Sequence, residues 1–254
     1  MIEVEREAGI ATVVLARPER RNAMDQPMMQ QLAQVLAELA ADAELRAMIL
    51  TGRGKVFCSG LDLGQMGESP TEPSLERALV DQILVPLERL PVPTIAAMNG
   101  DAYAGGLELA LHCDLRVAVR SARFGMPVAR IGIVVPYPLI LKLIDVVGAP
   151  ATSELLFSAE PITAERAHQL AMVNRLSEPE DLEAAAKALA RSIAGNAPLA
   201  VRAMKLAILA GRAQRALEAP SEVRVAAERA RSSEDAVEGL RAVGEKRKPE
   251  FRGR

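Results

Sequence analysis

Two short glycine-containing segments have the residue types and spacing that could do chemistry. The first is 57–63 (FCSGLDL) and the second is 99–108 (NGDAYAGGLE). Each follows an apolar, strand-like run and leads toward helical sequence, which is how a chain can bring two backbone N–H donors to one point. Two rigid, unpaired N–H groups can bind an oxygen that becomes negative during carbonyl chemistry. A tight turn is the alternative reading of either segment alone, and the pair together favours a site.

A carboxylic acid ends the second segment. Glu108 falls in the first turn of a helix expected over 106–113. Burial in an apolar pocket would raise its pKa and the helix N-terminus would lower it, so this side chain could be tuned for acid or base work. The alternative is a carboxylate that only compensates the helix dipole. Two further carboxylates, Asp62 and Asp101, are expected in turn or capping roles.

Composition sets limits on the class of protein. The chain has 254 residues, half of them apolar but only 2% aromatic, with a formal net charge of -2. This predicts one large core of Ala, Leu, Val, Ile and Met, and gives no field that would attract nucleic acid or an anionic membrane. Neither Cys58 nor Cys113 lies in a metal-like cluster, and Cys58 is expected to be a buried filler. We expect a cytoplasmic protein with reduced thiols, no metal, no nucleotide-binding loop and no membrane span.

The expected elements alternate between strand and helix along most of the chain. The pattern predicts a hairpin over 2–15, strands at 46–51, 94–98 and 115–119, and helices at 26–39, 75–90 and 106–113. This order indicates an α/β body with mainly parallel strands. The polar stretch 64–74 is expected to be a mobile surface loop. After about residue 136 the strand signal fades, and we expect Ala-rich helices interrupted at Pro161, Pro179, Pro198 and Pro220.

Six sequence pieces together resemble a known family. They are 17–23 (RPERRNA), 57–63, 99–108, 113–114 (CD), 123–127 (RFGMP) and 161–167 (PITAERA). Their order over essentially the whole chain resembles the crotonase (enoyl-CoA hydratase/isomerase) superfamily. The resemblance implies an α/β, ClpP-like spiral of ββα units over 1–195 and a helical trimerisation region over 196–254. It also implies an acyl-CoA substrate, a homotrimer or homohexamer, and no tightly bound cofactor, with coenzyme A entering as part of the thioester.

The resemblance assigns roles to particular residues. The backbone N–H groups of Leu61 and Gly105 would hold the thioester oxygen and stabilise an enolate. Glu108 matches the first of two hydratase glutamates. The second is expected just after 124–127, where this chain has Val128. Hydration needs one group to activate water and another to deliver a proton, and Val128 can do neither.

The run 124–137 is similar to the methylmalonyl-CoA decarboxylase branch, which also lacks the second glutamate. Loss of carbon dioxide makes an enolate without a base for proton abstraction. Tyr137 could orient a substrate carboxylate or donate a proton, or its ring could be buried with a wet hydroxyl, and Tyr103 is open in the same way. A catalytically silent acyl-CoA-binding or scaffold subunit is the third reading.

The resemblance also implies contacts to coenzyme A. Arg21, Ser59, Leu61, Asp62 and Leu63 are the candidates near the first glycine segment. Lys246 matches a lysine that approaches the phosphate region, sometimes across a subunit boundary. The alternative for the run 245–251 (EKRKPEF) is a solvated helix end whose cations compensate the dipole.

Overall fold

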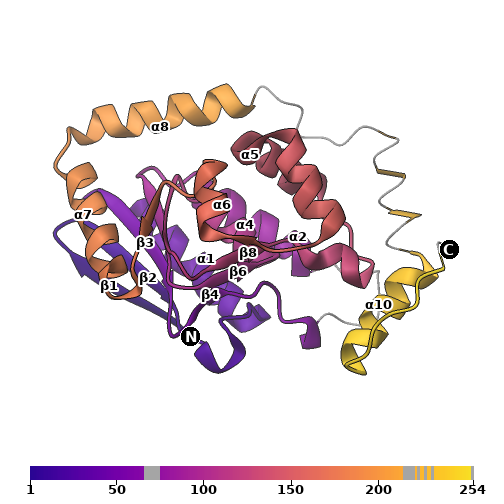
Figure 1. Ribbon diagram of the computed structural model, residues 1–254. Coiled ribbons are helices and arrows are strands. Elements are labelled where there is room, and N and C mark those ends of the chain that lie inside the picture. The colour runs from indigo at the N-terminus through magenta and orange to yellow at the C-terminus, as the bar shows by residue number, and fades with distance from the viewer. Residues whose placement is uncertain (66–74, 214–220, 222–223, 226–227, 230–231, 253–254) are drawn as a thin grey trace.

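The protein folds as an α/β body with helices packed around two sheets, seen in a computed structural model (Figure 1). The structure describes residues 1–65, 75–213, 221, 224–225, 228–229 and 232–252. Most of the polar stretch 64–74, and the interruption expected at Pro220, lie outside these residues. The expected crotonase fold and its mainly parallel strands are confirmed.

The larger sheet has six strands in the order β1-β2-β3-β5-β7-β10. They are β1 (Ile2–Glu7), β2 (Ile10–Leu15), β3 (Ala47–Gly52), β5 (Thr94–Met98), β7 (Leu115–Val119) and β10 (Arg175–Ser177). The predicted hairpin is confirmed: β1 and β2 pair antiparallel around Ala8 and Gly9, which both have positive φ angles. Every other pair in this sheet is parallel.

The smaller sheet carries the glycine segments. Its strands, in the order β4-β6-β8-β9, are β4 (Val56–Cys58), β6 (Asp101–Tyr103), β8 (Arg123–Gly125) and β9 (Ile162–Thr163). The first three run parallel, and β9 is antiparallel to β8. These two- and three-residue strands are not predictable from the sequence, because such short runs carry too little alternation to be recognised. Helices dominate after residue 136, as expected, and β9 and β10 are two short strands among them.

The predicted helices form, with local departures. They are α1 (Gln26–Ala41), α2 (Leu75–Ala78), α3 (Val85–Glu88), α4 (Gly105–Leu111), α5 (Tyr137–Ser158), α6 (Ala164–Gln169), α7 (Leu182–Ala194), α8 (Pro198–Ala213) and α10 (Glu234–Gly244). Between α2 and α3 a π-helical stretch, η3 (Leu79–Leu84), continues the same rod. Short 3₁₀ turns are η1 (Pro18–Arg20), η2 (Leu63–Gln65), η4 (Pro127–Ile131) and η5 (Pro179–Asp181). Gly148 interrupts α5 with a φ of 77°.

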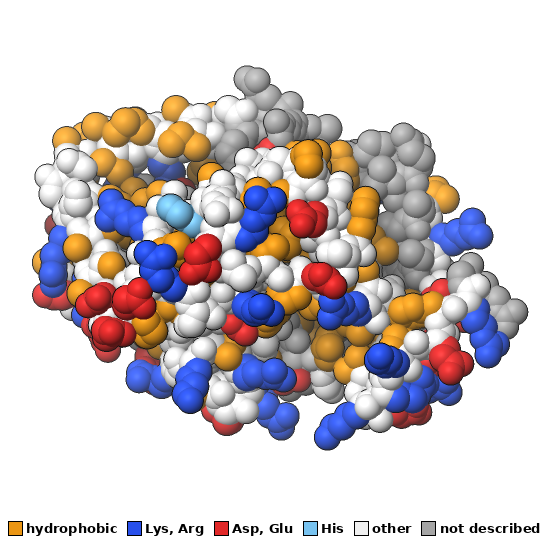
Figure 2. All heavy atoms as spheres, in the orientation of Figure 1, with side chains coloured by type: hydrophobic (Ala, Val, Ile, Leu, Met, Phe, Trp, Pro, Cys, Tyr) orange, Lys and Arg blue, Asp and Glu red, His pale blue; other side chains and the backbone are white. Residues whose placement is uncertain are grey.

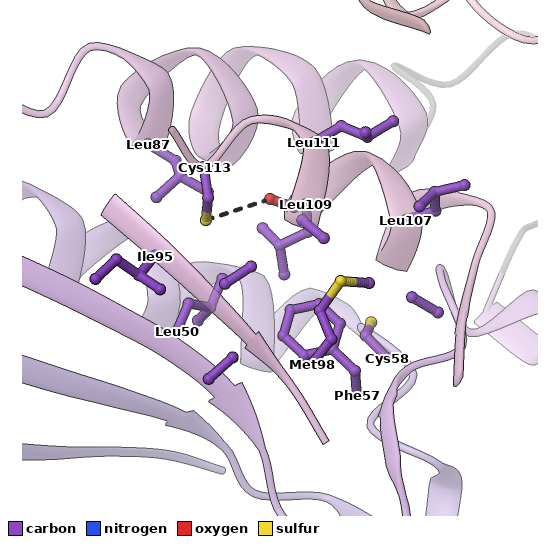
Figure 3. Packing of buried hydrophobic residues seen from close by; sticks show 14 of the residues in the cluster. Leu50, Phe57, Cys58, Leu87, Ile95, Met98, Leu107, Leu109, Leu111 and Cys113 are labelled. Carbon is purple, nitrogen blue, oxygen red and sulfur yellow. Dashed lines mark hydrogen bonds between the residues drawn. The ribbon is translucent and has the colours of Figure 1, made fainter. Parts of the chain in front are cut away.

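The core is aliphatic, as the composition predicts. Leu50, Ile95 and Met98 project from the larger sheet toward Leu109 of α4 (Figure 3). Phe57, from β4 of the smaller sheet, packs next to Met98 in the same buried cluster. The Cys113 thiol donates to the Leu109 carbonyl at 3.7 Å. This packing fixes α4 against both sheets.

No single helix in the described part of the chain is long and apolar enough to cross a bilayer. One bent pair, Pro179–Ala194 followed by Pro198–Gly211, passes by length and composition only.

Candidate active site

Three segments converge where the parallel strands of the smaller sheet end. Residues after Cys58 of β4, Tyr103 of β6 and Gly125 of β8 leave the same edge, since the three strands run in one direction. Ligands of parallel sheets bind at this carboxyl edge. The two glycine segments predicted to form a site are the first two of these segments, so the fold brings them together.

The turn after each strand has an unusual backbone. Gly60 has a φ of 97°, which glycine adopts without strain. Ala104 has a φ of 48° and a ψ of -123°, a region that costs a residue with a Cβ on the order of 1–3 kcal/mol. The Ala104 N–H donates to the Gly125 carbonyl at 3.0 Å, which ties this turn to the third segment. The strain at Ala104 is held where Gly105 is presented to the cavity.

The backbone N–H of Leu61 points away from Met24, the residue that its segment pairs with. Met24 pairs with the flanking residues: its N–H donates to the Gly60 carbonyl at 2.8 Å, and its carbonyl accepts from the Asp62 N–H at 2.9 Å. In such a parallel bridge the residue between, Leu61, directs its own N–H to the opposite side. Within the described part of the chain, this N–H donates to no other group.

The Gly105 N–H is the second donor. Gly105 is the first residue of α4, so its N–H has no intrahelical acceptor. Among the described residues it donates no hydrogen bond. The two turns touch: a Cβ on Gly60 would lie 3.2 Å from the Gly105 nitrogen. Leu61 and Gly105 both line one cavity.

Gly106 sets how closely α4 approaches the first turn. A Cβ at this position would lie 2.1 Å from the Cys58 carbonyl oxygen, closer than any real contact. Only glycine lets the start of the helix rest on the backbone of β4. The glycine pair of the second segment is therefore required by packing as well as by the turn.

Asn22 fixes the outer side of the first turn. It is fully buried with a φ of 53°, a conformation that asparagine tolerates. Its Nδ2 donates to the carbonyls of Arg53, Val56 and Phe57 at 3.0, 2.8 and 3.2 Å. The motif at 17–23 thus holds the loop that precedes the Leu61 turn.

Asp62 has a structural role. Its carboxylate pairs with the Arg17 guanidinium at 2.9 Å and accepts from the Gly64 N–H at 3.2 Å. The same guanidinium lies 3.2 Å from the Asp25 carboxylate, which caps α1. The turn role expected for Asp62 is confirmed. Asp101 likewise accepts the Arg123 N–H at 2.8 Å.

The cavity has a volume of about 660 Å³ and a largely apolar wall. The predicted residues Arg21, Ser59, Leu61, Asp62, Leu63, Gly105 and Glu108 all line it, as does Tyr103. Arg20 and Arg21 are exposed at its rim. The sequence analysis did not identify Leu79, Ile131, Ile133, Val134, Val135 and Leu139 as wall residues. The apolar run at 131–135 was the available signal.

Glu108 is the one acid among the described residues of this cavity that is fully enclosed. Its side chain is 1% exposed, and neither carboxyl oxygen has a hydrogen-bond partner among the described residues. Burial raises the pKa of Glu108 to about 8, against an opposing effect of the Lys142 cation. Lys142 on α5 is itself buried and paired with Glu88. Glu108 is therefore mostly protonated at neutral pH.

Two predicted residues lie off the cavity wall of this chain. Tyr137 starts α5 between the lining residues Pro136 and Leu139, and is half-buried without lining the cavity itself. Lys246 is exposed just after α10. Tyr103, which does line the cavity, donates its hydroxyl to Asp101 at 3.3 Å, and burial together with that carboxylate raises the pKa of Tyr103.

The remaining reactive side chains in the described part of the chain do not form a second centre. Burial raises the pKa of both Cys58 and Cys113 to about 12, which keeps the two thiols protonated, and the filler role of Cys58 is confirmed. His112 is buried, with its Nδ1 2.7 Å from the Glu108 carbonyl oxygen. No group of three or more metal-ligating side chains occurs in the ranges that the structure describes.

Comparisons with known proteins agree with this fold. The sequence profile of the family described as Enoyl-CoA hydratase/isomerase matches residues 5–254. The short-chain-enoyl-CoA hydratase of Clostridium acetobutylicum is 37% identical over 210 residues, which cover 82% of this chain and 80% of that protein. A methylmalonyl-CoA decarboxylase in complex with 2-nitronate-propionyl-CoA superposes with a TM-score of 0.92 at 28% identity, covering 100% of this chain and 98% of that one. An enoyl-CoA hydratase from Bacillus anthracis gives 0.78 at 31%, covering 100% and 99%.

The fold and the extent of these matches define an acyl-CoA-processing enzyme. The chain belongs to the enoyl-CoA hydratase/isomerase family.

Proposed function

We propose that the enzyme binds an acyl-CoA with its thioester oxygen between the Leu61 and Gly105 N–H groups, and stabilises the enolate formed there. The observation that carries the proposal is the pair of N–H donors that have no partner among the described residues and belong to residues lining the cavity that also holds Glu108. Preorganised N–H donors stabilise developing charge without having to reorient, and removal of one such donor typically costs about 10²–10³ in kcat.

Glu108 supplies the proton. Because its pKa is raised to about 8, the neutral carboxylic acid predominates at neutral pH and can protonate an enolate carbon. The wall around it offers no second acid or base in the place expected for one, because that place is Val128. The residues therefore support one-carboxyl chemistry at an enolate in preference to two-glutamate hydration.

Decarboxylation of a malonyl-type CoA is the second candidate. Its specific support is the neutral state of Glu108 together with Val128: carbon dioxide leaves, the electron pair passes into the thioester enolate, and the Glu108 proton then reaches the α carbon. No base is consumed in forming the enolate. The similarity to methylmalonyl-CoA decarboxylase is in line with this candidate.

The two candidates are separated by substrate consumption. The purified protein is incubated with crotonyl-CoA and, separately, with methylmalonyl-CoA, and product is measured by mass spectrometry. Glu108→Gln should lower the turnover of whichever thioester reacts by about 10²–10⁴-fold. Glu180→Gln, an exposed carboxyl on η5, is the matched control and should retain it. Binding of thioesters without turnover across a broad panel would instead identify a scaffold subunit.

The coenzyme A moiety is proposed to leave the cavity past Ser59, Leu63 and the exposed Arg21. Arginine suits the phosphates of this group. Lys246 and Tyr137 are kept as proposed contacts to coenzyme A and to the acyl group. Lys246→Ala should raise KM while leaving kcat, and Tyr137→Phe should lower kcat if the hydroxyl acts on substrate.

We further propose that the region 196–254 assembles the protein into trimers or hexamers. Four large apolar side chains of α8 are between 59% and 79% exposed: Leu199, Met204, Leu206 and Ile208. Figure 2 shows hydrophobic side chains gathered over this helix, at the upper left. α8 is anchored to the body at Lys205, whose ammonium meets the Asp114 carboxylate at 2.7 Å. Light scattering during gel filtration measures the oligomer, and a monomer would contradict the proposal.

A further inference from the structure

The apolar wall of the cavity rests on a helix from the far end of the chain. The wall consists of η4 and the residues 132–136 that follow it. Residues 132–136 form neither helix nor strand, and the whole wall connects β8 to α5. Its internal backbone ties include the Ile133 N–H to the Val128 carbonyl at 3.1 Å. Among the described elements, η4 is the one against which α10 makes its main packing. The position of this wall therefore depends on how closely α10 approaches.

Two glycines, Gly239 of α10 and Gly132 of the wall, allow the helix to lie this close to the wall. A Cβ at Gly239 of α10 would lie 2.1 Å from the Ile131 carbonyl oxygen. A Cβ at Gly132 would lie 2.9 Å from the Asp235 carbonyl oxygen and 3.0 Å from the Ala236 Cα. The two backbones are thus in direct contact over Ala236, Gly239 and the wall. No side chain lies between them that could yield by changing rotamer.

The helix is held as a unit from its outer side. Ser233 caps it, accepting from the Ala236 N–H at 3.1 Å. Glu238 binds the Arg247 guanidinium at 2.6 Å and the Glu250 N–H at 3.0 Å, so the final residues fold back along the helix. When a substitution pushes α10 and the wall apart, the helix therefore moves as one unit, and the displacement is shared between the helix and the wall.

We propose that α10 is a positioning element of the substrate cavity, with Gly239 setting how far the wall at 127–136 projects into it and hence which acyl chain fits. This inference rests on the proposed acyl-CoA function. Gly239 touches no substrate. It acts through Ile131, which lines the cavity, while Gly239 lies behind the wall.

A methyl group at Gly239 moves the wall inward. Real Cβ contacts are not shorter than 3.0 Å, so Gly239→Ala must separate the backbones by about 0.9 Å. α10 and the wall share this separation, and the wall's part of it takes from the cavity at most the space of about one methylene of an acyl chain. One methylene in an apolar pocket is worth about tenfold or more in discrimination, so longer acyl groups should lose affinity relative to short ones.

The test measures binding of two saturated thioesters, butyryl-CoA and decanoyl-CoA, by isothermal titration calorimetry with the full-length protein. Saturated thioesters make the readout independent of which reaction the enzyme catalyses, and their ratio cancels changes at the coenzyme A end. Gly239→Ala should lower the affinity for decanoyl-CoA relative to butyryl-CoA by about tenfold. Gly244→Ala, on the same helix with nothing within 4 Å of the new Cβ, should keep the wild-type ratio.

A second variant decides the matter if Gly239→Ala does not fold. Ala236→Gly loosens α10 where its backbone meets Gly132, because glycine is a poorer helix former than alanine. It introduces no clash and should shift the ratio toward decanoyl-CoA because the wall is less supported. A wild-type ratio in both Ala236→Gly and the folded Gly239→Ala protein would overturn the role of α10 while leaving the proposed function intact. Failure of the wild-type protein to bind either thioester would overturn the proposed function and this inference with it.

Discussion

Glu108 should make the stability of this protein fall as the pH rises, and Glu108→Gln should remove that dependence. In the folded protein the carboxyl is enclosed without a partner among the described residues, and its pKa is raised from 4.5 to about 8. In the unfolded chain it ionises near 4.5. Between these values the folded state retains a proton that the unfolded state releases, so increasing pH favours unfolding.

The size of the effect follows from the pKa difference. One pKa unit corresponds to about 1.36 kcal/mol. From about pH 5 to about pH 8, the free energy of unfolding of the wild-type protein should therefore fall by about 4 kcal/mol relative to that of Glu108→Gln. Well above pH 8 both states of the wild-type protein are ionised at this position, and the difference should then stay constant.

Urea unfolding at a fixed protein concentration measures this difference. Both proteins are titrated at a series of pH values, and other ionisable groups cancel because they are common to the two chains. Glu180→Gln serves as the control, since an exposed carboxyl should leave the wild-type pH dependence in place. Parallel stability profiles for wild type and Glu108→Gln between pH 5 and pH 8 would refute the account of a buried, neutral acid.

Three further experiments test the packing and electrostatics of the site. Gly106→Ala places a Cβ 2.1 Å from the Cys58 carbonyl oxygen and should lower the free energy of unfolding by about 3 kcal/mol. Gly211→Ala, with open space around the new Cβ, should leave this free energy unchanged or raise it by up to about 1 kcal/mol. Equal effects of the two substitutions in chemical unfolding would contradict the packing. Lys142→Met removes a cation that lowers the pKa of Glu108, so the pH–rate midpoint should move to higher pH, and an unmoved midpoint would exclude this coupling. Iodoacetamide should leave the native cysteines unmodified at mildly alkaline pH and label them in denaturant, as thiols with a pKa of about 12 require.

Much of the fold could be predicted because the larger elements carry strong periodic signals. The hairpin at 2–15, the helix beginning at Gln26 and the strand at 94–98 form where the pattern placed them. The strands β4, β6 and β8 escaped prediction because three residues are too few for alternation to show. These short strands are nevertheless what aligns the glycine segments, so the site was found through its turns and not through its sheet.

The chemistry of the site was predicted less completely. Glycine turns and a nearby acid are local features, and Leu61, Gly105 and Glu108 do share one cavity. The enclosure of Glu108 depends on packing among α4, α5 and the wall, which no local pattern encodes. The support of the wall by Gly239, more than 100 residues after Val128 in the chain, is a tertiary contact of the same kind.

The central claim is that two backbone N–H groups polarise a thioester carbonyl. Isotope-edited infrared spectroscopy of butyryl-CoA labelled with ¹³C at the thioester carbonyl measures this polarisation directly, because hydrogen bonds to the oxygen weaken the C=O bond. The account predicts that the labelled stretch moves to lower frequency when the thioester binds the protein. A bound thioester whose carbonyl stretch stays at its frequency in water would contradict it.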